Sequence, residues 1–238
     1  IDPDYPASNL GNPSTALEWR GGSTSPPEAF VYLQVDLGGL KEVDYFGIAR
    51  HNLGSTGAKV SVEHLDSTLS PPAWVEVLSE FSPSDDAPIV LRWTPAYYEN
   101  VRLKIEVGTE PPAIAVLYCG LLTKLPRNLY VGHAPMPYGR KSQVIGGMST
   151  SGDFLGRIVL TKSLTSEVAM PNVPPAIYRN EIDPFFRAAI DLPFFWAWRP
   201  YSYPTEVAFA WMTDDPDVSN QLPNGFMQVA WRMQGVAL

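Results

Sequence analysis

The chain has 238 residues, of which 45% are hydrophobic and 18% charged, so it can bury a core and is not a disordered chain. Its 25 acidic and 17 basic residues give a net charge of −8, and no basic cluster exceeds the pair Arg140–Lys141. This balance argues against a nucleic-acid partner held through its phosphates. Cys119 is the only cysteine, which excludes an intrachain disulfide. No apolar run approaches the ~18 residues of a membrane span, so we expect no transmembrane segment.

The 24 prolines fall between short apolar runs, which favours short strands and turns over long helices. Residues 31–37 and 43–50 are rich in β-branched and aromatic residues and are joined through Gly38-Gly39. They predict two strands that lie close together in space. Asp36 stands among hydrophobic neighbours and could bind a ligand. Its position near a strand end favours a different role, in which it accepts hydrogen bonds from backbone N–H groups of a turn.

Further strands are predicted along the first half of the chain, at residues 59–65, 74–78, 89–93, 101–107 and 114–122. The segment 101–107 alternates without interruption: Val101, Leu103 and Ile105 share one face, while charged residues share the other. One face of this strand therefore belongs to a core and the other to solvent. Six or seven short strands at this spacing predict an antiparallel β-sandwich.

Several short motifs occur in a fixed order over residues 7–122: Ala7-Ser8-Asn9-Leu10, Trp19, Val35-Asp36-Leu37-Gly38, Trp74 and Asn100 to Ile105. In this order they resemble the discoidin or galactose-binding-like jelly roll. The resemblance implies loops at one end of the sandwich that bind glycans or lipid head groups in many members, whereas other members are purely structural. We interpret Trp19 and Trp74 as packing residues rather than platforms for sugars.

Arg50, His51 and Asn52 follow the second predicted strand, where the jelly roll offers a binding loop. Their side chains could contact sugar hydroxyls. They could equally form an ordinary loop or a contact with another protein.

The amino-acid composition changes near residues 124–128. This change indicates a domain boundary and divides the chain into residues 1–125 and 126–238. The second part predicts strands at 142–148, 153–162, 206–212 and 226–233. Between them, apolar residues at near-helical spacing after Pro174-Pro175 predict a short helical element. Asp183-Pro184 is typical of an N-cap and first helical residue, so we expect that element to kink or restart at Pro184.

Residues suited to catalysis are scarce. His51, His64 and His133 lie far apart, and no metal-binding, nucleophile-elbow or nucleotide-binding motif is present. The acid pairs Asp85-Asp86 and Asp214-Asp215 stand in turn-like segments. We therefore predict no catalytic residue, no metal ion and no cofactor, and a protein that is not an enzyme.

Residues 192–204 combine three prolines with many aromatic residues, namely Phe194, Phe195, Trp196, Trp198, Tyr201 and Tyr203. So large an aromatic content in an extended segment is typical of a subunit interface. A well-filled core strand is the alternative, and the sequence does not choose between them.

The helical element, the aromatic segment, the closing strand and the run Ser149 to Arg157 resemble the tail-tube-type or distal-tail-type domain of tailed bacteriophages, over residues 126–238. The resemblance implies a mainly β fold with one short helix, and a homo-oligomeric, hexameric ring around the tail channel. Typical distal tail proteins carry the ring domain first, and here the order is reversed, so tail-tip or baseplate component is the better description.

The two resemblances together predict a structural protein of the virion. Its jelly roll would contact other tail proteins or host surface glycans. The alternative function is a secreted or surface carbohydrate-binding module without catalytic activity.

Overall fold

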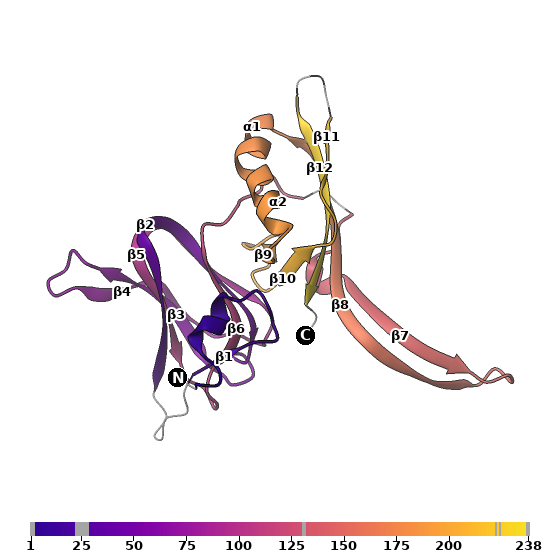
Figure 1. Cartoon of the computed structure of the whole chain (residues 1–238), viewed down its shortest axis with the longest axis horizontal. Coiled ribbons are helices and arrows are strands. Elements are labelled where there is room, and N and C mark those ends of the chain that lie inside the picture. The colour runs from indigo at the N-terminus through magenta and orange to yellow at the C-terminus, as the bar shows by residue number, and fades with distance from the viewer. Residues whose placement is uncertain (1–2, 22–28, 130–131, 222, 224, 237–238) are drawn as a thin grey trace. The chain divides into compact units, whose positions relative to one another are not determined.

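The computed structural model describes residues 3–21, 29–129, 132–221, 223 and 225–236 (Figure 1). The chain divides into two compact units, unit 1 (Ile1–Leu122) and unit 2 (Thr123–Leu238), close to the boundary that the sequence indicated. Both units are built on antiparallel sheets, and unit 2 also contains one short helical segment. The predicted mainly β class is therefore confirmed.

Unit 1 contains a 3₁₀ helix and a six-stranded antiparallel sheet of order β1-β6-β2-β5-β3-β4. Its elements are η1 (Ala7–Gly11), β1 (Trp19–Arg20), β2 (Phe30–His51), β3 (Lys59–Asp66), β4 (Ala73–Phe81), β5 (Ile89–Glu106) and β6 (Ala113–Gly120). The alternation predicted for residues 101–107 is confirmed, because Val101, Leu103 and Ile105 are fully buried.

The segments 31–37 and 43–50 are two halves of the single strand β2, so the prediction of two neighbouring strands was wrong. Residues 45–51 pair with β6, whereas residues 30–36 pair with β5 alone among the described residues. The strand bends between the halves at Gly38 (φ 67°) and Gly39 (φ 129°), where the register shifts. Glycine adopts these left-handed angles without steric cost, so the pair bends the strand from one layer of the sandwich into the other instead of reversing it.

Unit 2 has a sheet of order β7-β8-β12-β10-β9, with β11 also paired to β12. Its elements are η2 (Met136–Tyr138), β7 (Arg140–Met148), β8 (Phe154–Val173), α1 (Pro175–Ile177), η3 (Tyr178–Ile182), α2 (Asp183–Ala189), β9 (Phe194–Ala197), β10 (Val207–Met212), β11 (Asp217–Asn220) and β12 (Met227–Val236). The predicted strands and helical element are confirmed, but Asp183, predicted as an N-cap, has helical angles (φ −63°, ψ −45°) because the helical segment continues through it. Strand β11 and the second half of β8 had not been predicted, and β9 corresponds to the core strand that was one of two alternatives for the aromatic segment.

The helical segment covers the core of unit 2. It runs from α1 through a π-helical turn, η3, into α2, where Pro184 occupies the first turn. Proline lacks the N–H that a helix interior needs, and the wide turn before it accommodates the ring. Ile182 and Phe186 are buried on one face, and Phe186 packs against Trp231 with ring centroids 5.4 Å apart. No helix of the described residues is long and apolar enough to cross a membrane.

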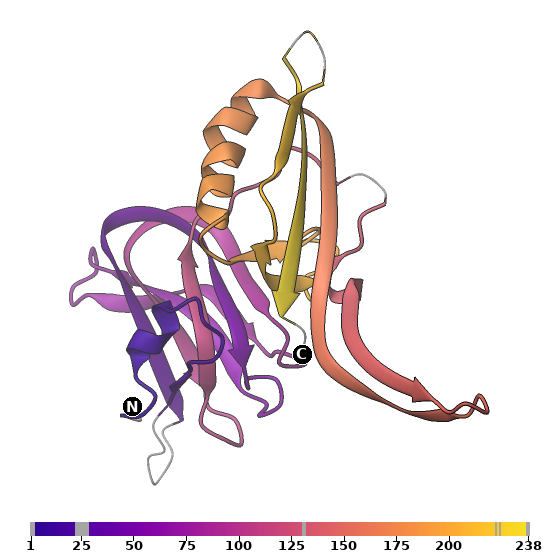
Figure 2. The same ribbon diagram turned by 45° about the vertical axis from the view of Figure 1, so that its right-hand side comes forward.

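Strand β8 pairs with two different strands along its length. Residues 163–173 pair with β12, and residues 154–164 pair with β7. The β7–β8 hairpin consequently leaves the sheet and extends away from the rest of unit 2 (Figures 1 and 2). We call residues 140–162 the arm.

Candidate functional site

Arg50 and His51, which the sequence predicted in a loop, are the last two residues of β2, and internal hydrogen bonds fix His51 there. The buried ring places Nε2 2.8 Å from the carbonyl oxygen of Ala87, and Nδ1 accepts a hydrogen bond from the N–H of Leu53 at 3.2 Å. Since Nδ1 accepts, Nε2 carries the proton and donates to Ala87. Burial lowers the pKa of His51, so the neutral ring is favoured.

Asn52 joins two loops in the same way. Its Nδ2 donates to the carbonyl oxygen of Pro111 at 3.0 Å, and its Oδ1 accepts from the N–H of Ala113 at 2.8 Å. Of the three predicted residues, only Arg50 exposes its side chain. The structure therefore gives His51 and Asn52 a role in holding this end of the sandwich together.

Asp36, which could have bound a ligand, also has a structural partner. Oδ1 of Asp36 accepts from the N–H of Gly38 at 2.8 Å, which confirms the predicted turn role. The half-buried Cys119 thiol has a pKa raised to about 12 by burial. Among the described residues, no group of three or more His, Cys, Asp or Glu side chains could hold a metal ion.

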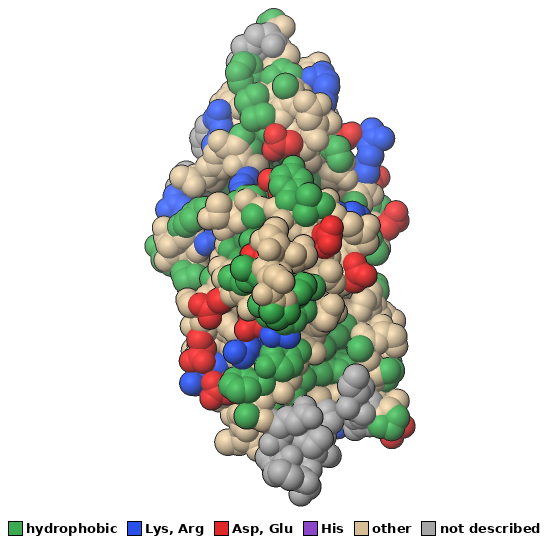
Figure 3. All heavy atoms as spheres, turned by 90° about the vertical axis from the view of Figure 1, so that its left-hand side faces the viewer, with side chains coloured by type: hydrophobic (Ala, Val, Ile, Leu, Met, Phe, Trp, Pro, Cys, Tyr) green, Lys and Arg blue, Asp and Glu red, His purple; other side chains and the backbone are tan. Residues whose placement is uncertain are grey.

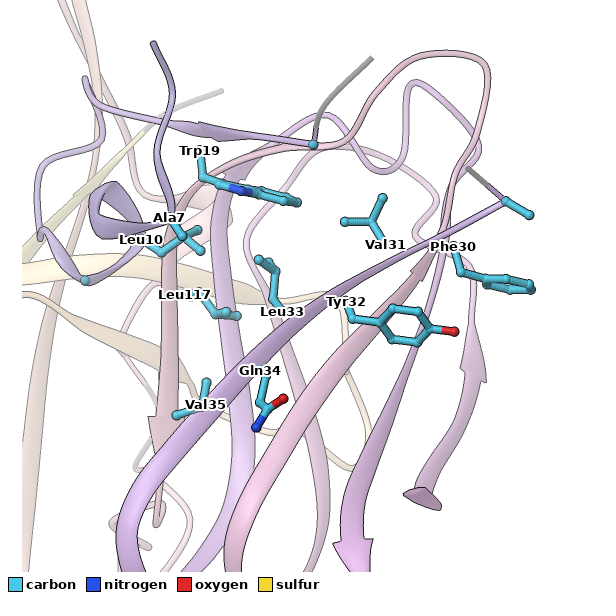
Figure 4. Close-up of a pocket in the computed structure, with 13 residues that line it drawn as sticks. Ala7, Leu10, Trp19, Phe30, Val31, Tyr32, Leu33, Gln34, Val35 and Leu117 are labelled. Carbon is cyan, nitrogen blue, oxygen red and sulfur yellow. The ribbon is translucent and has the colours of Figure 1, made fainter. Parts of the chain in front are cut away.

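A pocket of about 910 Å³ lies between η1, Trp19 and the first half of β2. Figure 4 shows the side chains of Leu10, Leu33 and Leu117 grouped near Trp19, whereas Phe30 and Tyr32 point the other way from β2. Trp19 is 1% exposed and belongs to the core, as its packing interpretation predicted. The lining is mostly apolar, with Tyr32 and Gln34 as its polar side chains, so the pocket suits an apolar group or the flat face of a ring.

The outer face of this part of unit 1 carries a stack of aromatic and charged groups. The guanidinium of Arg102 lies 4.2 Å from the ring centroid of Tyr32 and 4.1 Å from that of Trp74, and its Nε donates to Glu63 at 2.6 Å. Arg102 thus occupies one face of each ring. In Figure 3, hydrophobic side chains form separate patches with acidic and basic side chains between them, so that view shows no broad basic field.

The aromatic segment of unit 2 divides into two parts. In β9, Phe194 and Trp196 are each 8% exposed, and Trp196 packs edge-on against Trp231 with ring centroids 5.7 Å apart. These two side chains therefore belong to the core, and Phe195 is half-buried against Phe209.

Beyond β9 the aromatic residues approach the surface. Trp198 stacks on Tyr203 with ring centroids 5.4 Å apart, and its indole N–H donates to Glu206. Glu206 also accepts from the hydroxyl of Tyr138 at 2.9 Å. Tyr201 is 89% exposed and Tyr203 is 45% exposed. Of the aromatic side chains in the segment, Tyr201 and Tyr203 are therefore the ones most accessible to another molecule.

The arm exposes apolar side chains on both of its faces. All residues of β7 and residues 154–162 of β8 are exposed, and Met148, Phe154 and Leu155 are about 70% exposed. Val144 pairs with Val159 and Ile145 with Ile158. Adjacent pairs point to opposite faces of a hairpin, so neither face is purely polar.

The arm also has two unpaired edges. Among the described residues, β7 pairs only with β8, and residues 154–162 of β8 pair only with β7. A two-stranded hairpin is marginally stable by itself, and free strand edges bind other strands. These properties make the arm the strongest candidate for an interaction surface. The sequence predicted its two strands but not their exposure.

Neither a scan against protein-family models nor a search of curated proteins finds a match. Solved structures similar to this chain include SpGH29 (15% identity, TM-score 0.40), with 51% of this chain and 25% of that chain covered. They also include chitosan-binding module 1 of a chitosanase/glucanase from Paenibacillus sp. IK-5 (13% identity, TM-score 0.41, 50% and 86% covered). A pectin binding carbohydrate binding module is a further example (15% identity, TM-score 0.38, 50% and 82% covered). The matched region thus spans only a quarter of SpGH29, and at these identities and TM-scores the similarity supports no argument about function.

Proposed function

We propose that this chain is a non-catalytic structural subunit that joins other protein chains through the arm of unit 2, and that unit 1 is a peripheral binding domain. The main support for this proposal is the exposure of the arm's apolar side chains. A hairpin with apolar residues on both faces and two free edges gains stability only when another surface covers it. Protein–protein assembly supplies such a surface.

The type of assembly that we propose is a homo-oligomeric ring in the tail tip or baseplate of a tailed phage. The resemblance of residues 126–238 to tail-tube-type domains supports this choice. Unit 1 would then face other tail proteins or host glycans. Detection of the chain in purified phage particles by mass spectrometry, and a ring in negative-stain images, would test the proposed location.

The role of the arm can be tested by mass photometry of the full chain. We expect the wild-type protein to form oligomers and the double variant Ile145→Ser/Ile158→Ser to be monomeric, with an unchanged circular dichroism spectrum because both side chains are exposed. The control is Leu40→Ser/Leu121→Ser, which removes two exposed apolar side chains outside the arm and should leave the oligomers intact. A wild-type protein that stays monomeric at every concentration tested would refute the proposal.

Glycan binding by unit 1 is the second candidate function, in line with a surface carbohydrate-binding module. The pocket beside β2 favours it, because its mostly apolar lining suits the face of a sugar ring. A glycan array should then show binding by the wild type that Ala7→Trp abolishes, because the added ring at this exposed lining residue fills the pocket. Tyr97→Ala is the control, since Tyr97 is 61% exposed and does not line the pocket. Equal binding by both variants would exclude the pocket.

A further inference from the structure

A protruding acidic segment lies between β10 and β11. The N–H of Thr213 donates to the carbonyl oxygen of Arg232 at 3.2 Å, and Asp217 pairs with Ala230. More residues lie between Thr213 and Asp217 than between their partners Arg232 and Ala230 on β12, so the extra residues bulge out from the edge of the sheet. Asp214 and Asp215 are exposed in this bulge.

The bulge belongs to a larger patch of negative charge. Arg232 forms an ion pair with Glu167 at 3.2 Å, and its pKa is raised by Glu167 and also by Asp214 and Asp217. Trp211 is 36% exposed and pairs with Gln234, so it lies on the same face of the sheet as Arg232. We define the acidic patch as the residues Glu167, Trp211, Asp214, Asp215, Asp217 and Arg232. Four acids and one base give it a net charge of −3.

The arm carries the opposite charge. Its four basic residues are Arg140, Lys141, Arg157 and Lys162, and Asp153 is its only acid, so it has a net charge of +3 in a chain whose net charge is −8. The arm and the acidic patch each combine charged groups with exposed apolar side chains. They are therefore complementary in both charge and polarity.

The topology of unit 2 prevents the outer part of the arm from reaching the acidic bulge of its own chain. The arm extends from β8, whereas β10 and β11 pair with the other edge of β12. The pairing of β12 with β8 ends at Val236 and Ser163, where the arm leaves the sheet, and β11 pairs with the opposite end of β12. Figure 1 shows the arm leading away from β11. Bringing the arm against the acidic patch therefore requires a second copy of the chain.

We propose that the arm of one copy docks onto the acidic patch of a second copy. The inference rests on the assembly function proposed above and names the surface that receives the arm. Arg157 and Lys162 face the acids of the bulge, and apolar arm residues cover Trp211. Because donor and acceptor surfaces differ, each copy offers one of each, and the contact is head-to-tail. Such contacts close into a ring or continue as a filament.

Charge reversal with full-length chains tests the contact. The arm variant Arg157→Glu/Lys162→Glu and the patch variant Asp214→Lys/Asp215→Lys each place like charges against each other. We expect each variant alone to associate on the order of 100-fold more weakly than the wild type at low salt. Mixed in equal amounts, the two variants should assemble again, because each arm then meets a patch of opposite charge. Mass photometry of the single variants and of the mixture measures both effects.

The control Glu181→Lys/Asp191→Lys makes the same charge change at exposed acids outside the acidic patch and should assemble like the wild type. If the arm and patch variants also assemble like the wild type, or if the mixture of two folded monomeric variants does not assemble, the docking proposal is refuted. Loss of oligomers in Ile145→Ser/Ile158→Ser with intact oligomers in both charge variants would retain the arm as an interface but exclude the acidic patch. Monomeric wild-type protein would overturn both proposals.

Discussion

At the scale of single residues, burial determines the protonation of His51. The folded chain holds the neutral ring, and desolvation lowers the pKa below the ordinary value of 6.5. Below pH 6.5 the unfolded chain binds a proton that the folded chain does not bind. The contribution of His51 to stability is therefore fully present above this pH and is lost as the pH falls from 6.5 toward the folded-state pKa.

Urea unfolding of unit 1 within the full chain should show this dependence. Between pH 7.5 and 5.5 we expect the free energy of unfolding of the wild type to fall because of His51. In His51→Gln, position 51 cannot titrate, so the change in the free energy of unfolding between the two pH values should be smaller, whatever the absolute stability of the variant. His64→Gln is the control, because His64 is only half-buried, with its ring tilted against Tyr98 at 4.7 Å between centroids. The same pH difference in wild type and His51→Gln would contradict the explanation.

At the scale of elements, the bend in β2 depends on backbone conformation at Gly38. Gly38 has φ 67°, and a Cβ atom added there would meet nothing within 4 Å. Gly38→Ala should therefore destabilise unit 1 by about 1–2 kcal/mol through backbone strain alone. Gly11→Ala is a matched control, since it also has open space but no left-handed φ. Chemical denaturation measures both, and equal stability of the two variants would refute the strain argument.

The helical segment of unit 2 is held by apolar packing. Phe186 is 4% exposed and contacts Trp231, whereas Phe154 on the arm is 71% exposed. Phe186→Ala should lower the free energy of unfolding of unit 2 by about 3–5 kcal/mol because it leaves a cavity. Phe154→Ala should change it by less than about 0.5 kcal/mol in the monomer. Comparable losses in both variants, measured by urea titration at low protein concentration, would argue against this packing.

At the scale of the whole molecule, the two units have separate cores. The core of unit 1 is built around Phe46 and Leu103, and that of unit 2 around Trp231 and Met170. We expect differential scanning calorimetry to show two transitions. Gly38→Ala should lower the temperature of one transition, and Phe186→Ala that of the other. Equal shifts of both transitions in each variant would show instead that the units unfold together.

Local pattern predicted much of this fold. Alternation in residues 101–107 identified a buried face, and the apolar spacing after Pro175 identified the helical element. Asp36 was also interpreted correctly, since its hydrogen bond to Gly38 is local in sequence. Features of this kind follow from period and turn chemistry within a few residues.

The candidate sites could be predicted only in part. His51 and Asn52 were predicted in a loop, but His51 ends β2, and the hydrogen-bond partners Ala87 and Pro111 lie far along the chain. In the aromatic segment, the sequence could not separate the buried Trp196 from the exposed Tyr201. Whether a side chain is buried, and which group it bonds to, depends on packing against distant parts of the chain. The sequence of one segment does not contain that information.

The sequence by itself determined the class of the protein, the positions of most strands and the core-facing side of residues 101–107, because these depend on the spacing of neighbouring residues. Only the tertiary structure decided which edges and faces have partners. Residues 142–148 and 153–162 were predicted as strands, but their exposure follows from their pairing: among the described residues, these segments pair only with each other. Strand pairing is non-local, and it leaves the arm uncovered.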